Sequence, residues 1–357
     1  MRILQVMAGA PHGGAETAFV DMCIAMHEAG QMVEVVTRAN EVRVPRLRAA
    51  GIVVHTLPFG GGIDFYTPYA LRRIVRQFKP DIVQTWMSRA AQKVSRWDVS
   101  MGIPPYLVVS RLGGYYKIKN FQNTDHFAVI TPDIGQYLMR ECAVSESRIR
   151  QINNFAETEC IETSVSRSDH GVPKDGFLCL GLGRLHSSKA FDTLIKAIYP
   201  LENVYLWIAG EGPDRDDLES LIREMGMENR VTLLGWRSDR AALFEAVDAC
   251  VFSSRYEPFG TVFVQAWANN TALVTTDADG PRQFVRHEED GLVTPIDDIG
   301  AMTAAIGRVK DDISLRNDLI ENGSQRYLQE FTKEQSVRAY LEYFQSIRET
   351  AGYDAQS

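Results

Sequence analysis

The sequence predicts an α/β protein built from two doubly wound domains. Short apolar runs alternate with helical patterns along most of the chain, as in parallel sheets covered by helices. This alternation is interrupted once, at the polar, turn-rich residues 156–176, and 357 residues are long for one hydrophobic core. We therefore expect one domain over residues 1–160 and a second over 172–333. A helix at about 335–357 should pack back on the first.

In the first half, an apolar strand at the N-terminus leads through a glycine turn into a helix over residues 15–28. Residues 67–87 predict a helix and then a strand, separated by Pro80, and residues 126–142 predict a strand and then a helix. The remaining apolar runs predict strands within residues 31–39, 51–59 and 104–114.

The second half repeats this alternation. Apolar runs predict strands within residues 177–185, 204–212, 231–236, 249–254 and 272–277, and helical patterns begin at Phe191 and near residues 214–225. An amphipathic pattern over residues 331–349 predicts the final helix.

Composition is that of a soluble globular protein, with 45% hydrophobic and 24% charged residues. No apolar run is long enough for a membrane span, and the N-terminus does not resemble a signal peptide. The five cysteines form no CxxC pair. We therefore expect a reduced, cytoplasmic protein without a structural metal.

Charge is distributed unevenly, because residues 38–119 carry 14 Lys or Arg against 4 acidic residues although the net charge is −8. This basic segment is either an ordinary solvated surface or a face for an anionic partner. Such a partner would be a phosphorylated acceptor or an anionic membrane surface at the inner face. Nucleic acid is not expected, because no binding motif accompanies the charge.

Residues 251–267 predict a strand, a tight turn and a helix, the arrangement at which parallel sheets bind ligands. Glu257 lies in the turn, where sugar hydroxyls would suit its carboxylate, or where it simply caps the helix. The first glycine turn places Gly13 and Gly14 before a helix without the G-x-G-x-x-G pattern, and Arg38 stands where a dinucleotide site has an acidic residue. It predicts only a turn that a ligand can approach closely.

Five stretches of the second half resemble one family. They are GRLHSSKAFDTLIKA (183–197), IAGEGPDRDDL (208–218), LLGW (233–236), SRYEPFGTVFVQA (254–266), and DADGPRQFV with DGLVTP (290–295). In this order they resemble the retaining GT-B glycosyltransferases of family 4, also called glycosyl transferases group 1. The first half resembles the family through GGAET and KPDIVQTW. Its other local sequences are similar to those of a branch of the family associated with bacterial surface polysaccharide or lipopolysaccharide assembly. The resemblance implies two Rossmann-like domains facing a cleft, with the donor on the second and the acceptor on the first.

The resemblance also implies roles for single residues. Arg184 and Lys189 match the cations that hold the donor diphosphate, where negative charge grows in the transition state; Lys189 alone would otherwise be a solvated lysine at a helix start. Glu257 matches the carboxylate that holds the transferred sugar. Trp236 matches a base contact or is plain packing. The other predicted donor-binding positions are Gly13, Gly14, Gly183, Gly210, Gly212, Phe259, Gly260, Thr261 and Gln265.

Three positions depart from the family pattern. Gln265 replaces the second glutamate of the signature, which accepts hydrogen bonds from ribose, and an amide accepts more weakly than a carboxylate. Ala190 replaces the glycine after the lysine, and Gln283 replaces a glutamate. These departures put donor affinity and nucleotide preference in doubt.

No histidine can be assigned to the catalytic position that relatives carry in the first domain. Arg111, at a strand end, is the candidate to stabilise the leaving phosphate or position the acceptor; otherwise it is a surface charge. His12 lies in the glycine turn as a weaker candidate, a structural role is favoured for His126, and Glu16 should cap its helix. Asp277 and Asp279 spell a DxD motif, but its place in the chain does not favour a metal.

We therefore expect a bacterial, cytoplasmic, metal-independent retaining glycosyltransferase of the hexosyltransferase type with no bound cofactor. A UDP-sugar is the favoured donor, the acceptor is a glycan or glycolipid, and the protein would be peripheral at the membrane. One alternative is a GT-B-like nucleotide-sugar epimerase, for which no carboxylate and histidine set is evident. Another is a catalytically silent relative that binds nucleotide or acts as a scaffold, suggested by Gln265 and Gln283.

Overall fold

The computed structural model describes residues 1–11, 13–61, 63–157, 161 and 163–353. The chain forms two compact units: an N-terminal unit of residues 1–154 with 333–357, and a C-terminal unit of residues 155–332. The expected boundary at residue 160 lies outside the described residues. The chain passes from one unit to the next after Asn154 and returns before Lys333.

The N-terminal unit contains a seven-stranded sheet within the described residues, in the order β3-β2-β1-β4-β5-β6-β7. Every neighbouring pair is parallel. The strands are β1 (Arg2–Met7), β2 (Met32–Thr37), β3 (Val53–Thr56), β4 (Ile82–Trp86), β5 (Leu107–Leu112), β6 (His126–Val129) and β7 (Ile149–Gln151). The order reverses between β1 and β4, which makes this pair the topological switch point of the sheet.

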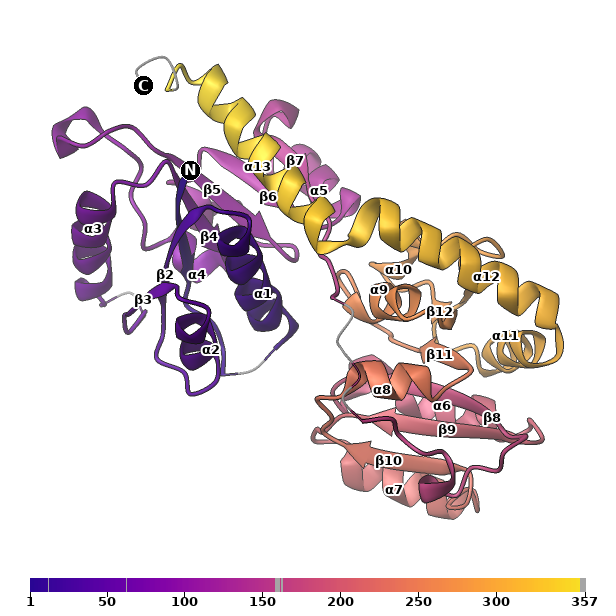
Figure 1. Ribbon diagram of the computed structural model, residues 1–357. Coiled ribbons are helices and arrows are strands. Elements are labelled where there is room, and N and C mark those ends of the chain that lie inside the picture. The colour runs from indigo at the N-terminus through magenta and orange to yellow at the C-terminus, as the bar shows by residue number, and fades with distance from the viewer. Residues whose placement is uncertain (12, 62, 158–160, 162, 354–357) are drawn as a thin grey trace. The chain divides into compact units, whose positions relative to one another are not determined.

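Helices cover both faces of this sheet (Figure 1). They are α1 (Gly14–Glu28), α2 (Arg43–Ala49), α3 (Tyr66–Phe78), α4 (Met87–Ala91), α5 (Pro132–Cys142) and α13 (Lys333–Thr350), with short turns η1 (Val99–Met101), η2 (Ile118–Phe121) and η3 (Glu146–Arg148). Local chemistry explains several boundaries. The Thr131 hydroxyl accepts a hydrogen bond from the Ile134 N–H at the start of α5. Lys79 ends α3 in the left-handed conformation just before Pro80.

The last helix belongs to the N-terminal unit although it ends the chain. In α13, the Tyr343 hydroxyl donates to the Phe127 carbonyl of β6 at 3.2 Å, and Ser336 donates to the Asn153 carbonyl at 3.0 Å. Phe344 is fully buried. The amphipathic tail of the sequence thus covers part of the first core, because its apolar face needs a partner.

The C-terminal unit contains a six-stranded parallel sheet within the described residues, in the order β10-β9-β8-β11-β12-β13. The strands are β8 (Phe177–Leu182), β9 (Val204–Ala209), β10 (Val231–Gly235), β11 (Ala249–Phe252), β12 (Ala272–Thr276) and β13 (Leu292–Thr294). The helices are α6 (Phe191–Ile198), α7 (Arg215–Glu224), α8 (Arg240–Glu245), α9 (Thr261–Ala268), α10 (Pro281–Phe284), α11 (Ile299–Asp311) and α12 (Ile313–Arg326), with turns η4 (Ser168–His170), η5 (Ser187–Lys189) and the π-helical η6 (Tyr327–Phe331). The order reverses between β8 and β11.

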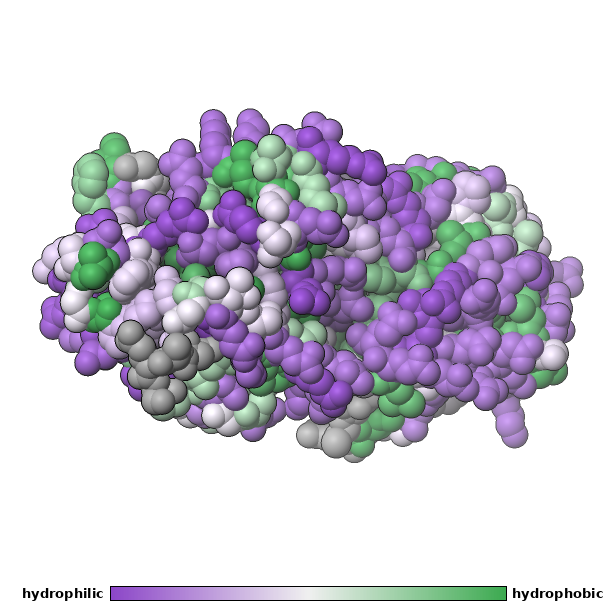
Figure 2. Space-filling model, turned by 90° about the horizontal axis from the view of Figure 1, so that it is seen from above, coloured by the Kyte–Doolittle hydropathy of each residue, from purple (hydrophilic) through white to green (hydrophobic). Residues whose placement is uncertain are grey.

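The prediction of an α/β fold with two parallel sheets is confirmed. Central strands such as β5, β8 and β12 are buried along their whole length, which explains their predominantly apolar sequences. The face shown in Figure 2 is mostly hydrophilic, with hydrophobic residues in small patches. Within the described residues, no helix has the length and apolar character needed to cross a membrane.

Candidate donor-binding site

The predicted donor-binding residues of the C-terminal unit gather at one edge of its sheet. Gly183 follows β8, Gly210 follows β9, Trp236 follows β10 and Glu257 follows β11. These strands are parallel neighbours, so their carboxyl ends lie side by side. The edge includes the switch point between β8 and β11, where open α/β sheets bind ligands.

An ion pair joins two of these loops. The Lys189 ammonium, in η5 after β8, donates to the Glu257 carboxylate after β11. Both side chains are largely shielded, with exposed fractions of 20% and 18%. The Lys189 ammonium also lies 5.5 Å from the centre of the Phe252 ring, and Ser253 Oγ donates to the Lys189 carbonyl at 2.8 Å. Lys189 is therefore not a freely solvated lysine, and this alternative is wrong.

Glu257 does not cap the following helix. Helix α9 begins at Thr261 after Gly260, with no side chain bonded to its first N–H groups among the described residues. Gly260 has φ of +90°, and a Cβ there would lie 2.6 Å from the Phe252 ring. The capping interpretation of Glu257 is therefore wrong. The Glu257 carboxylate is instead neutralised by Lys189.

Arg184 is the second cation of this edge. Its side chain is exposed and makes no hydrogen bond or ion pair with the part of the chain that the structure describes. Lys189 is held in place by Glu257, whereas Arg184 is free to meet an anion. The two cations follow the same strand, five residues apart.

Close contact between loops explains the glycines after β9. A Cβ on Gly210 would lie 1.8 Å from the Gly183 carbonyl oxygen, and one on Gly212 would lie 2.1 Å from the Leu185 carbonyl oxygen. The Leu185 N–H in turn donates to the Glu211 carbonyl at 3.0 Å. Only residues without a side chain allow these backbones to approach so closely.

Two predicted aromatic contacts differ in exposure. Trp236 is 78% exposed, so the interpretation of its ring as plain packing is wrong. Phe259 is only 3% exposed and packs on the Phe263 and Phe284 rings at 5.3 and 5.2 Å. The Phe259 ring thus anchors the loop that carries Glu257, and the expectation that position 259 contributes to donor binding stays a prediction.

The three departures from the family pattern have different surroundings. Gln265 is partly exposed on α9, and its amide has no hydrogen bond among the described residues. Ala190 is buried in the left-handed conformation with φ of 53°, which costs an alanine more than a glycine. The Gln283 amide donates to the Asp279 carbonyl. Of the three, only Gln265 presents an unused polar group.

Sequence reasoning missed Arg255, which links three segments near this edge. Its guanidinium donates to Asp192 at 2.9 Å, to Asp297 at 2.8 Å and to the Ser187 carbonyl at 2.6 Å. The hydrogen bonds to Asp192 and Asp297 raise the pKa of Arg255. Ser187 is the first residue of the turn that ends at Lys189. By binding the Ser187 carbonyl, Arg255 helps to hold this turn, and with it Lys189, in place.

The DxD carboxylates are used by the fold. Asp277 accepts a hydrogen bond from the Ile296 N–H at 2.9 Å, and Asp279 lies 3.2 Å from the Arg282 guanidinium. Among the described residues, no three His, Cys, Asp or Glu side chains come together as a metal site would require.

In the N-terminal unit, Arg111 is not a surface charge, and that alternative is wrong. It is 2% exposed, its guanidinium lies 4.4 Å from the centre of the Trp86 ring, and it donates to Asn154 Oδ1 at 2.6 Å. The Tyr340 hydroxyl of α13 also lies close to the Arg111 guanidinium. Burial lowers the pKa of Arg111. Its contacts tie β5 to the last helix, so we assign it a structural role in place of the expected catalytic one.

The first glycine turn also differs from expectation. Gly13 and Gly14 stand at the start of α1, but Glu16 does not cap that helix: its carboxylate accepts from the Ala10 N–H at 2.7 Å and so holds the turn itself. The Arg43 guanidinium also holds the turn, because it donates to the Ala10 carbonyl at 3.1 Å. His12 lies outside the described residues. His126 is partly buried, with its ring 6.2 Å from that of Tyr343, a structural setting.

Comparison with known proteins identifies the class. The family described as Glycosyl transferases group 1 matches residues 162–326, and the family described as Glycosyltransferase Family 4 matches residues 12–159. Among solved structures, a glycosyltransferase from Rickettsia africae superposes with a TM-score of 0.85 at 16% identity, covering 97% of this chain and 98% of that one. Anabaena HepE, in complex with UDP, superposes with a TM-score of 0.81 at 20% identity, covering 97% and 100%. The fold is GT-B.

Two relatives of known name extend over nearly the whole chain. The lipopolysaccharide core biosynthesis glycosyltransferase LpsE of Rhizobium meliloti is 32% identical over 337 residues, covering 94% of this chain and 96% of the relative. LpsD of the same organism is 31% identical over 346 residues, covering 96% and 98%. The chain therefore belongs to the family 4, group 1 glycosyltransferases, and it is an enzyme of the glycosyltransferase class.

Proposed function

We propose that this enzyme transfers a sugar from a nucleoside-diphosphate sugar, in the first place a UDP-sugar, to a glycan or lipopolysaccharide intermediate of the bacterial cell surface. The transfer would be of the hexosyl type and would retain the configuration of the anomeric carbon. The observation that carries this proposal is the pairing of Lys189 with Glu257 beside the unpaired Arg184, at the switch point of the sheet.

The chemistry follows from where charge develops. Breaking the bond between the sugar and the diphosphate moves negative charge onto the leaving oxygens, and preset cations lower that barrier. Arg184 and Lys189 would hold the diphosphate, while Glu257 would accept hydrogen bonds from hydroxyls of the sugar. No carboxylate is assigned as nucleophile, so we propose that the acceptor attacks from the face that the diphosphate leaves.

The choice of donor and acceptor rests on relatives. HepE of Anabaena has been solved in complex with UDP and with UDP-glucose. LpsE and LpsD are named for lipopolysaccharide core biosynthesis. We propose by analogy a UDP-sugar donor and an acceptor of that kind.

We also propose that the reaction needs no divalent metal and that the enzyme works in the cytoplasm, peripheral at an anionic inner membrane surface. Two cations at the donor edge supply charge that a metal would otherwise bring. The basic segment of residues 38–119 would favour a membrane carrying anionic lipids.

Donor binding is tested by thermal unfolding with UDP, GDP, ADP, TDP and CDP, each with and without Mg²⁺. A ligand that binds the native state raises the unfolding temperature by mass action. We expect a rise with UDP that does not depend on Mg²⁺, is lost in Arg184→Ala and persists in Arg223→Ala, a control on the last turn of α7. No rise with UDP, or one that requires Mg²⁺, would contradict this part of the proposal.

Transfer is tested with labelled UDP-sugars and truncated lipopolysaccharide acceptors. We expect a product whose new linkage, read by NMR coupling constants, keeps the anomeric configuration of the donor. Inversion would exclude the retaining mechanism, and transfer only to soluble small alcohols would exclude the proposed acceptor class.

A further inference from the structure

A group of large hydrophobic side chains stands exposed at the start of α3. Ile63 is 88% exposed, Phe65 78%, Tyr66 61% and Tyr69 68%. A single exposed apolar side chain is ordinary, but four within seven residues are not. The start of α3 therefore has the character of an interaction surface.

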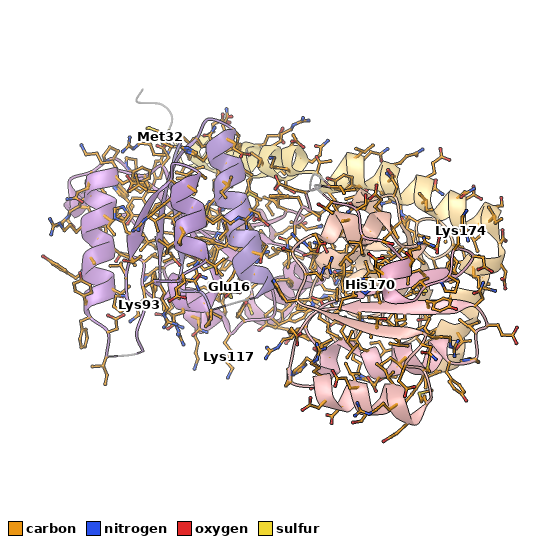
Figure 3. The ribbon with its side chains drawn as sticks, turned by 60° about the horizontal axis from the view of Figure 1, so that its bottom comes forward. Glu16, Met32, Lys93, Lys117, His170 and Lys174 are labelled. Atoms are coloured by element: carbon orange, nitrogen blue, oxygen red, sulfur yellow. The ribbon has the colours of Figure 1, made fainter. Side chains whose placement is uncertain are left out.

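These side chains are carried on a loop that is held firmly from inside. The Lys93 ammonium, 9% exposed, donates to the Gly61 carbonyl at 3.0 Å and the Asp64 carbonyl at 2.9 Å. The Asp64 carboxylate accepts from the Gly60 N–H at 2.7 Å and from the Thr67 N–H at 2.9 Å. Hydrogen bonds from Thr67 lower the pKa of Asp64 to about 2, so the carboxylate stays ionised. Lys93 is labelled in Figure 3, close to the end of α3 at which the loop enters.

The network turns polar groups inward and leaves apolar groups outward. The Asp64 carboxylate and the Lys93 ammonium lie 3.8 Å apart and are mostly buried, whereas Ile63 and Phe65, on either side of Asp64, face water. A loop that simply needed solubility would show the opposite pattern. The hydrophobic display is thus built into the loop.

The outer side of α3 continues from this group into a basic strip. The exposed residues Phe65, Tyr69, Arg73 and Arg76 follow one another at helical spacing. The opposite side of α3, with Leu71, Ile74 and Phe78, is buried. Residues 65–79 contain no acidic residue. The side chains of Arg73 and Arg76 form no ion pair within the described part of the chain. The strip is thus uncompensated positive charge.

We propose that this surface, the aromatic–arginine face of Ile63, Phe65, Tyr66, Tyr69, Arg73 and Arg76, docks the enzyme onto an anionic membrane. The hydrophobic side chains would enter the boundary between lipid headgroups and acyl chains, where tyrosines are enriched, and the arginines would meet lipid phosphates. This proposal deepens the membrane part of the proposed function by naming the surface. It does not depend on which sugar is transferred.

A membrane fits these residues better than a soluble anion does. Ile63 and Phe65 have no polar atom in their side chains, so they gain only by leaving water. Arg73 and Arg76 lie on the two turns of α3 that follow Tyr69. This order, with hydrophobic side chains first and arginines next, suits a membrane interface, in which anionic headgroups cover an apolar layer. A soluble phosphate would use the arginines and leave the hydrophobic group exposed.

The test is co-sedimentation of the full chain with vesicles of phosphatidylcholine alone or with about one third phosphatidylglycerol. We expect binding to the anionic vesicles that weakens at high salt. Arg73→Gln with Arg76→Gln should weaken it about 10- to 30-fold, and Ile63→Ser with Phe65→Ser by a similar factor. Arg48→Gln, on the exposed side of α2, is the matched control and should bind normally. Equal binding by all variants, or binding to phosphatidylcholine alone as strong as to the anionic vesicles, would overturn the proposal.

A second readout separates this inference from the proposed function. The variants should keep their unfolding temperature and their response to UDP, because the altered side chains are exposed and lie outside the C-terminal unit. Their transfer to a detergent-dispersed acceptor should equal that of the wild type, and their transfer to the same acceptor in anionic vesicles should fall. If glycerol phosphate, as a soluble headgroup, displaced the protein from vesicles at millimolar concentration, the face would be a soluble-anion site and the proposal would be wrong.

Discussion

Lys189 and Glu257 form an ion pair although 68 residues separate them in sequence. Each follows one of two strands, β8 and β11, that are parallel neighbours at the switch point of the sheet. The pair leaves the carboxylate oriented and neutralised before any ligand arrives. Because the two groups lie side by side at this edge, a diphosphate held by Lys189 and a sugar held by Glu257 would be adjacent.

Removing the charge of Glu257 tests this arrangement. We expect Glu257→Gln to lower kcat/KM for sugar transfer by about 100-fold, or about 2.7 kcal/mol, because a positioned charged partner of the reacting sugar is lost. The measurement is steady-state transfer with varied donor. Glu224→Gln, exposed at the end of α7, should leave kcat/KM unchanged, and a wild-type rate in Glu257→Gln would remove the residue from the site.

The Gly210 position tests the close packing of the loops. A methyl group there would meet the Gly183 carbonyl oxygen at 1.8 Å, so Gly210→Ala should lower the free energy of unfolding by about 3 kcal/mol. Urea unfolding measures this. Gly307→Ala, inside α11 with its nearest neighbour at 3.6 Å, should be neutral or slightly stabilising. Equal stability of the two variants would show that the loops do not pack in this way.

Stability should depend on pH through Arg255. Its hydrogen bond lowers the pKa of Asp297 below the ordinary value. A carboxyl group whose pKa is lower in the folded state stabilises the protein above its unfolded pKa, near 4, and loses this contribution as pH falls through the folded pKa. Arg255→Met should therefore be less stable at pH 7, by about 1 kcal/mol because these groups are partly exposed, with the difference shrinking below pH 4. Urea unfolding at pH 7 and pH 3 decides it, and a difference that grows at low pH would contradict the assignment.

Gln265 tests the nucleotide end of the site. Its amide has no partner among the described residues, and a carboxylate accepts hydrogen bonds more strongly than an amide. We expect Gln265→Glu to tighten UDP binding about 3- to 10-fold by isothermal calorimetry if ribose hydroxyls lie there. An unchanged Kd would place the ribose elsewhere.

Arg111 separates a structural role from a catalytic one. Arg111→Met should cost about 3 kcal/mol of unfolding free energy, because Asn154 and Tyr340 would lose a buried partner. At a temperature where the variant stays folded, kcat should remain within about threefold of the wild type. A stable variant with a large loss of kcat would restore the catalytic prediction.

Much of the fold could be predicted from the chain alone. The alternation of apolar runs and helical patterns predicted the central strands, and a tail with one apolar side predicted α13. The short helices α2, α4 and α8 were not predicted, because pieces of five to seven residues hold too few turns for a periodic signal. The longer helices α11 and α12 were not predicted either. In the site, Arg184, Lys189 and Glu257 were found through their motifs, whereas Arg255 lies inside the stretch 254–266 but was given no role, because its ion pairs with distant segments leave no trace in the local sequence.

The sequence by itself determined the fold class, the family and the loops that carry the donor-site candidates, because periodicity and motifs are local properties of a chain. Only the tertiary structure decided how particular side chains are used. It buried Arg111 against Trp86, withdrew Phe259 into the core, exposed Trp236 and joined Lys189 to Glu257. Burial and pairing depend on which distant segments the sheets bring together. The local sequence around an arginine at a strand end is the same whether its side chain faces water or a tryptophan ring.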